Sequence, residues 1–167
     1  MTHTSIIDTP LGPVRASAEQ DALTGLWFVG QKYYPSGTDA WADAPDAPVF
    51  NTLREWLADY FSGGRHAPLP ALAPKGTAFQ KAVWDILLQI PYGRVTTYGE
   101  IAKQLAAARR LPSMSAQAVG GAVGHNPISI LIPCHRVVGA DGSLTGYAGG
   151  LEKKTALLQL ERGPTCR

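Results

Sequence analysis

Apolar residues in the first half of the chain change from strand-like to helix-like spacing. Three short apolar stretches, at 5–7, 13–18 and 23–29, are bounded by turn residues and predict strands. A helix is predicted after them, because five apolar residues recur at helical spacing: Phe50, Leu53, Leu57, Tyr60 and Phe61. The stretch 35–48 between strands and helix is rich in Pro, Asp and Ala and predicts a loop.

A run of chain breakers follows this helix. Gly63, Gly64, Pro68, Pro70 and Pro74 interrupt any regular element. We therefore expect an N-terminal domain over 1–74 and a C-terminal domain over 75–167. The fold class is predicted to be α/β, with a small strand-rich N-terminal domain and a mostly helical C-terminal domain.

Three helices are predicted after the breakers. Thr77 and Gln80 have the spacing of a capping box, and the apolar face that follows stops at Pro91-Tyr92-Gly93. Thr97 and Glu100 repeat that spacing before a second helix. The third stretch, 115–124, is rich in Ala and Gly, although each Gly costs a helix roughly 1 kcal/mol relative to Ala.

Two explanations fit the small residues of 115–124. They can permit tight packing inside the protein, or they can let another surface approach the helix backbone. Two consecutive helices with a short connection resemble a helix-turn-helix. The second helix has few side chains able to read base edges, so this explanation predicts recognition of shape in a narrow groove.

Charge and composition limit the class of protein. The 167 residues carry a net charge of +2, which divides into an acidic 1–74 and a basic 75–167. An excess of basic residues in 75–167 favours a polyanionic partner, although such an excess more often forms only a solvated charged face. No apolar run is long enough for a membrane span, no signal peptide is present, and two cysteines make no disulfide framework. We expect a cytoplasmic protein without membrane contact, in which Cys166 is incidental.

Cys134 lies beside His135 and Arg136 in an apolar run, 132–138, that predicts a strand. A buried cysteine is commonly only a small core residue. A reactive cysteine needs neighbours that favour its thiolate, and here a base and a positive charge follow it. Adjacent side chains of a strand point to opposite faces, so Cys134 and His135 are not expected to bond directly unless the strand ends in a turn. The pair alone leaves both interpretations open.

Several ordered motifs decide between them. They lie at 90–102, 118–120, 126–127, 133–137 and 146–150, and together they resemble the O6-alkylguanine-DNA alkyltransferase family. Residues 1–74 match the family's N-terminal domain only loosely. The resemblance implies a ribonuclease H-like N-terminal domain, a helix-turn-helix in the C-terminal domain, and a protein that flips O6-alkylguanine out of double-stranded DNA and transfers the alkyl group irreversibly to a cysteine.

The resemblance also implies the catalytic residues. Cys134 would accept the alkyl group, His135 would activate it through a water molecule, and Glu161 would orient the histidine. Tyr98 would donate to a ring nitrogen of the base, and Asn126 would tie the helix-turn-helix to the active-site loop.

Substrate and DNA contacts follow from the same resemblance. Tyr147 would cap the flipped base, the backbone at Val137 would read its exocyclic amine, Ala148 would lie beside O6, and Lys154 would help to hold the site. The expected minor-groove DNA contacts come from small and polar positions: Thr97, Ala116, Gln117, Ala118, Gly120 and Arg136. Gln117 departs from the family pattern, which has an intercalating arginine there and so supplies a charge that Gln lacks.

The connection before the third helix is longer than the family pattern. Its Arg109 and Arg110 can offset the missing charge by meeting phosphates, or can be only an exposed helix end. We expect no metal and no cofactor, and a monomer, with cooperative assembly on DNA left open. The alternatives are a non-catalytic sensor of alkylated DNA, a thiol hydrolase, and a helix-turn-helix regulator.

Overall fold

The computed structural model describes residues 1–163 and divides into two compact units. The first unit contains Met1–Lys75 together with Pro127–Ser129, and the second contains Gly76–Asn126 with Ile130–Arg162. The predicted division into domains 1–74 and 75–167 did not include the return of Pro127–Ser129 to the first unit. Cys166 lies outside the described residues.

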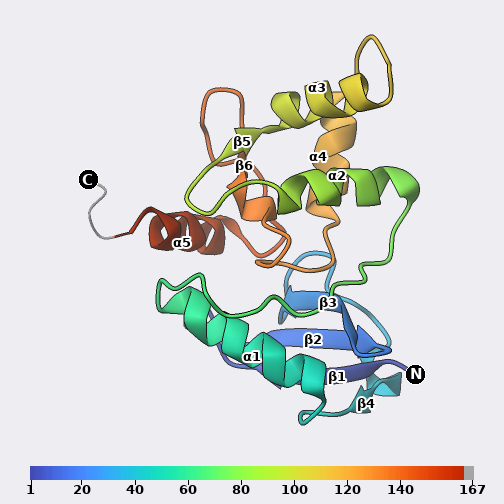
Figure 1. The fold of residues 1–167 in the computed structure, drawn as a ribbon, viewed down its shortest axis with the longest axis vertical. Coiled ribbons are helices and arrows are strands. Elements are labelled where there is room, and N and C mark those ends of the chain that lie inside the picture. Colours follow the sequence, from blue (N-terminus) through green and yellow to red (C-terminus); the bar gives the residue numbers. More distant parts are fainter. Residues whose placement is uncertain (164–167) are drawn as a thin grey trace. The chain divides into compact units, whose positions relative to one another are not determined.

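The first unit is built on a four-stranded sheet with the order β3-β2-β1-β4 (Figure 1). Strands β1 (His3–Ile7), β2 (Val14–Glu19) and β3 (Ala22–Phe28) are antiparallel neighbours, joined by short turns. Helix α1 (Pro48–Phe61) buries four residues of the predicted apolar face, while the fifth, Phe61, is half-buried. The three predicted strands and the helix are confirmed within one or two residues at each end.

The stretch 35–48 is not only a loop. It contains a short 3-10 helix, η1 (Thr38–Ala40), and strand β4 (Ala42–Asp43), which is parallel to β1. The backbone N–H groups of Ala42 and Ala44 donate to Thr2 and Thr4 at 2.9 Å. The open edge of β1 creates this strand, so no local apolar pattern could predict it.

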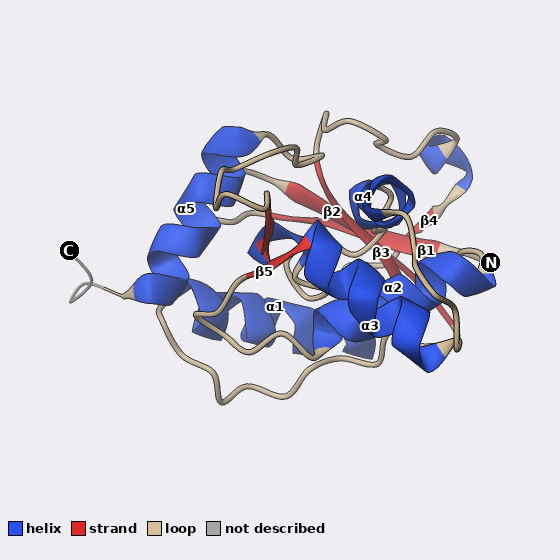
Figure 2. Cartoon of the chain, turned by 90° about the horizontal axis from the view of Figure 1, so that it is seen from above, coloured by secondary structure: helices blue, strands red, loops and turns tan. Residues whose placement is uncertain are grey.

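The second unit contains helices α2 (Ala78–Leu88), α3 (Tyr98–Ala108), α4 (Ala116–Gly124) and α5 (Leu151–Arg162) (Figure 2). The predicted capping box is present, since the Thr77 hydroxyl accepts from Gln80 N while the Gln80 side chain accepts from Thr77 N, both at 3.0 Å. Thr97 and Ser115 cap α3 and α4 by accepting from Glu100 and Ala118. The mixed α/β class is therefore confirmed.

The strand predicted at 132–138 is wrong over residues 132–136. Cys134–Arg136 form a 3-10 turn, η2, and only Val137–Val138 form strand β6, which pairs in parallel with β5 (Thr96–Thr97). Pro133 has φ −81° and ψ 65°, and Cys134 N donates to Ile132 O at 2.7 Å. These are the angles and hydrogen bond of an inverse γ-turn, which bends the chain before the cysteine.

Trp84 holds α4 against α2. The Ala122 carbonyl belongs to the last turn of α4, where carbonyl groups have no intrahelical partner. The buried Trp84 indole donates to this oxygen at 2.9 Å. The hydrogen bond therefore satisfies a helix end inside the protein.

We predict that Trp84→Phe lowers the free energy of unfolding by about 1–3 kcal/mol, because the buried carbonyl of Ala122 loses its donor. Urea denaturation checks this value. Trp56→Phe is the matched control, since half-buried Trp56 stacks on Tyr60 and a phenyl ring keeps that contact. Equal losses in the two variants would contradict the role given to the hydrogen bond.

Candidate active site

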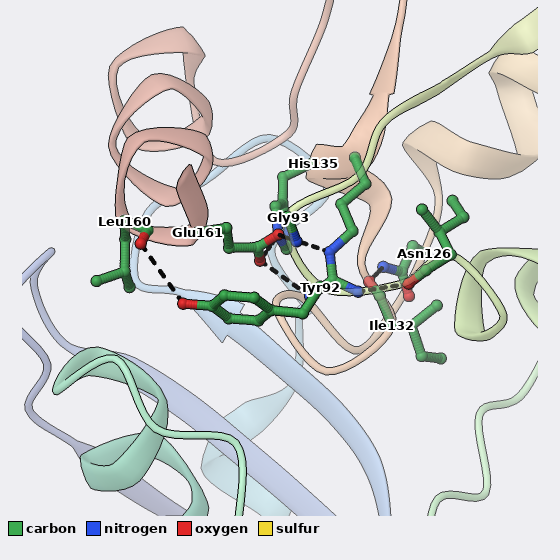
Figure 3. Close-up of polar contacts among 9 residues, drawn as sticks. Tyr92, Gly93, Asn126, Ile132, His135, Leu160 and Glu161 are labelled. Carbon is green, nitrogen blue, oxygen red and sulfur yellow. Dashed lines mark hydrogen bonds and ion pairs between the residues drawn. The ribbon is translucent and has the colours of Figure 1, made fainter. Parts of the chain in front are cut away.

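The site is centred on the buried carboxylate of Glu161, near the end of α5 (Figure 3). His135 Nε2 lies 2.6 Å from Glu161 Oε2. Arg136 donates to both carboxylate oxygens, through Nε at 2.7 Å and Nη2 at 3.0 Å. The backbone N–H of Gly93 adds a donor at 3.3 Å. One carboxylate thus joins α5, the η2 turn and the chain that follows α2.

This geometry fixes the tautomer and the protonation state of His135. An ionised carboxylate only accepts hydrogen bonds, so Nε2 of the imidazole carries the proton and donates it to Glu161. Burial lowers the pKa of His135, against the opposing hydrogen bond and charge of Glu161. The paired charge of Arg136 also opposes a second positive charge on the ring. Nδ1 is buried without a partner among the described residues, which leaves its lone pair able to take up a proton.

Cys134 is 8% exposed and is the single cysteine in the described residues. Burial raises the pKa of its thiol, while a hydrogen bond from Asn126 and the charge of Lys154 act in the opposite direction. The resting group is therefore a thiol. For its sulfur to react as a nucleophile at neutral pH, a base must remove this proton.

Asn126 holds the chain segment that precedes Cys134. Its side-chain N–H₂ donates to Ile132 O at 2.8 Å, two residues before Cys134. Within this segment Ile130 has φ 71°, a left-handed conformation that is unfavourable for a β-branched residue. The buried amide of Asn126 thus helps to hold a strained turn next to the reactive group.

Lys154 holds the loop between β6 and α5. Its fully buried ammonium donates to Val137 O at 2.6 Å, Thr145 O at 2.9 Å and Gly146 O at 3.2 Å. Burial lowers its pKa, and the nearby Cys134 opposes this shift. All three protons point to backbone carbonyls, so Lys154 shapes the loop and has no donor left for a bound molecule.

The same loop carries Tyr147 and Ala148, both half-buried. Tyr98, the first residue of α3, donates its hydroxyl to Thr145 O at 3.3 Å. The pairing of Thr97 with Val138 brings the start of α3 beside the end of the reactive turn. The structure thus brings Tyr98, Val137 and Lys154 together around one loop.

The exposed face of α4 is bare. Ala116, Gln117 and Ala118 are exposed, and a Cβ added at Gly121 or Gly124 would meet nothing within 4 Å. A Cβ at Gly120 would meet only the Tyr98 ring at 3.8 Å, an ordinary contact. Internal packing therefore does not require these glycines, which favours the approach of another surface.

Arg136 makes several contacts inside the protein. Besides Glu161, its Nη1 donates to Ile90 O at 2.7 Å, and its guanidinium lies 5.7 Å from the centroid of the Tyr92 ring. Its charge is paired with Glu161, and its predicted contact with DNA stays a prediction. The Thr97 hydroxyl is likewise used as the cap of α3.

Tyr92 and Gly93 had no role in the sequence analysis. The Tyr92 hydroxyl donates to Leu160 O at 3.5 Å, and a Cβ at Gly93 would lie 3.3 Å from Glu161 O. Gly93 also has φ 79°, where glycine is favoured. The sequence showed these residues only as a helix stop.

Comparison with known proteins identifies the family of the chain. Residues 78–163 match the family model described as 6-O-methylguanine DNA methyltransferase, DNA binding domain. The chain belongs to this family. It is 46% identical over 162 residues to the methylated-DNA--protein-cysteine methyltransferase of Mycobacterium tuberculosis, covering 97% of this chain and 93% of the relative. The Haemophilus influenzae protein of the same name is 42% identical over 158 residues, covering 93% and 84%.

Solved structures agree with this family assignment. A crystal structure of Mycobacterium tuberculosis OGT in complex with DNA has a TM-score of 0.84 and 43% identity, covering 96% of this chain and 92% of that one. An O6-methylguanine DNA methyltransferase from Methanococcus jannaschii has a TM-score of 0.67 and 28% identity, covering 98% and 96%. The resemblance noted in the sequence is therefore confirmed.

The structure was also compared with the expectations about a metal site and a membrane span. Within residues 1–163, no three His, Cys, Asp or Glu side chains gather as a metal site, and no helix is long and apolar enough to cross a membrane. The absence of a metal and of a cofactor stays a prediction.

Acid should destabilise the protein through His135. Since burial lowers its folded-state pKa, the unfolded chain takes up a proton near the ordinary pKa of 6.5 while the folded protein does not. The unfolded state then binds more protons, so the free energy of unfolding falls as pH drops through that value. Denaturation at several pH values between about 7.5 and about 5.5 measures this slope. His135→Gln, which cannot titrate, should show a shallower slope; parallel slopes would refute the neutral histidine.

Proposed function

We propose that this protein removes alkyl groups from O6 of guanine in double-stranded DNA by transferring them to Cys134 in a single, irreversible turnover. The proposal is supported by a protonated, buried cysteine next to a neutral histidine that a buried glutamate orients. The family assignment makes DNA the partner and alkyl transfer the reaction. The chemistry follows from the residues described above.

In the reaction, the sulfur of Cys134 attacks the alkyl carbon while the bond from that carbon to guanine O6 breaks. The thiol proton passes, through a bridging water, to Nδ1 of His135, and the charge that develops on the imidazole is stabilised by Glu161. The electron pair of the broken bond goes to guanine, and Tyr98 donates a proton or hydrogen bond to its ring nitrogen. A thioether has no easy hydrolytic route back, so each molecule acts once.

The proposed roles of the remaining site residues come from the family resemblance. Tyr147 packs on the extruded base, Ala148 lies beside O6, and the backbone at Val137 meets the exocyclic amine. Asn126 and Lys154 act as positioning residues, because their donors are directed to the cysteine segment and to loop carbonyls.

Helices α3 and α4 are proposed to form a helix-turn-helix that places the bare face of α4 in the minor groove. Ala116, Ala118 and Gly120 allow close approach, and Gln117 enters the stack where the base has left. The first unit, with three antiparallel strands, a parallel β4 and α1, is proposed to be ribonuclease H-like. We further propose that the protein is a cytoplasmic monomer, able to assemble cooperatively on DNA.

The rival functions are disfavoured by the same site. A sensor of alkylated DNA needs no activated cysteine, whereas here Cys134 has a base and an orienting carboxylate beside it. A thiol hydrolase would turn over repeatedly, and the named relatives are methyltransferases.

The proposal is tested by the intact mass of the protein after incubation with duplex DNA carrying one O6-methylguanine. We expect one added methyl group, mapped to Cys134, in step with loss of the lesion. Cys134→Ala should gain none. Repeated turnover without modification would indicate a hydrolase, and binding without transfer would indicate a sensor.

Glu161→Gln should lower the single-turnover rate constant by about 10²-fold, because the amide still accepts a hydrogen bond from His135 but cannot stabilise its positive charge. Glu152→Gln is the matched control, since Glu152 is exposed in the first turn of the same helix. Circular dichroism verifies that both variants fold. Equal rate constants for Glu161→Gln and the wild type would remove Glu161 from the proton relay.

Gly121→Leu should abolish tight DNA binding while the protein stays folded. The added side chain points into open space on α4 and improves helix propensity, so thermal stability should be unchanged or higher. It also prevents a duplex from approaching the helix backbone. Fluorescence anisotropy with a labelled duplex measures the loss, and unchanged affinity would place the DNA on another surface.

A further inference from the structure

Helix α3 ends in a Schellman motif whose left-handed residue is Arg110. Its N–H donates to Ala107 O at 3.2 Å, and that of Leu111 donates to Ala106 O at 2.8 Å. Arg110 has φ 57°. Glycine is the usual residue at this position, because an L side chain is disfavoured in the left-handed region.

No contact within the described chain compensates for this strain. Arg110 is exposed, and its guanidinium has no hydrogen bond, ion pair or ring contact among residues 1–163. The neighbouring Arg109 differs, since its guanidinium lies 5.5 Å from the centroid of the Phe79 ring. Folding therefore explains the position of Arg109 but not the presence of an arginine at 110.

The place of Arg110 in the second unit indicates its partner. The connection that follows α3 leads directly into the N-cap of α4, Ser115, and so flanks the exposed first turn of that helix (Figure 1). The first turn itself contributes Ala116, Gln117 and Ala118, none of which carries a charge. The minor groove is only about 6 Å wide, so a helix seated on it lies between two rows of phosphates. Arg110 lies in the connection that enters α4 and is the charge there that can meet one row.

We propose that Arg110 binds a backbone phosphate of the duplex seated on α4, and so supplies charge that Gln117 does not. This inference rests on the proposed function, because it takes the bare face of α4 as the DNA surface. It assigns to Arg110 a contact without sequence information, which adds affinity and positions the duplex. An arginine at this position adds strain to the turn, because its φ is 57°.

The test compares the salt dependence of duplex binding in four proteins: wild type, Arg110→Gly, Arg110→Lys and Lys81→Gln. Arg110→Gly should reduce the slope of log affinity against log salt concentration by about 1, because one fewer phosphate is neutralised. Its melting temperature should rise, because glycine relieves the left-handed strain. Arg110→Lys keeps the charge and should keep the slope, and Lys81→Gln removes one exposed charge on α2 and should also keep it.

The outcomes separate this inference from the function on which it rests. A wild-type protein that neither binds duplex DNA nor accepts a methyl group would overturn the proposed function. A wild-type protein that does both, with the same salt slope in Arg110→Gly, would overturn the assignment of Arg110 alone. Equal slope losses in Arg110→Gly and Lys81→Gln would also overturn it, since charge anywhere on the surface would then suffice.

Discussion

The buried carboxylate of Glu161 is the interaction on which the site depends. It receives hydrogen bonds from His135 and Arg136 of the η2 turn and from Gly93, which lies in the chain that follows α2. A buried carboxylate is stable only when it is paired and its oxygens are hydrogen-bonded. Both conditions are met here, and removing the carboxylate would leave the half-buried Arg136 without its counter-ion.

Burial sets the resting form of the histidine. It is the main cause that lowers the pKa of His135, against the hydrogen bond and the charge of Glu161. The charge of Arg136, which is paired with the same carboxylate, acts in the same direction as burial. The neutral imidazole can then act as a proton acceptor while Cys134 remains a thiol. The nucleophile therefore stays unreactive until an alkylated guanine enters the site.

Much of the fold could be predicted from the sequence where local physics decides. The three antiparallel strands, α1 and the caps at Thr77 and Thr97 follow from apolar periodicity and from the spacing of capping residues. The short β4 depends on the free edge of β1, and the turn at Cys134 depends on an inverse γ-turn at Pro133, which the apolar run concealed. The position of Arg136 could not be predicted, because a strand would direct it away from Glu161 and only the 3-10 turn brings them together.

The resting state of His135 is the central claim, and the ¹⁵N chemical shifts of its ring, measured at neutral pH, test it directly. We expect a neutral imidazole with the proton on Nε2 and an unprotonated Nδ1, in agreement with the donor to Glu161. A doubly protonated ring, or a proton on Nδ1, would contradict the account of how Cys134 loses its proton.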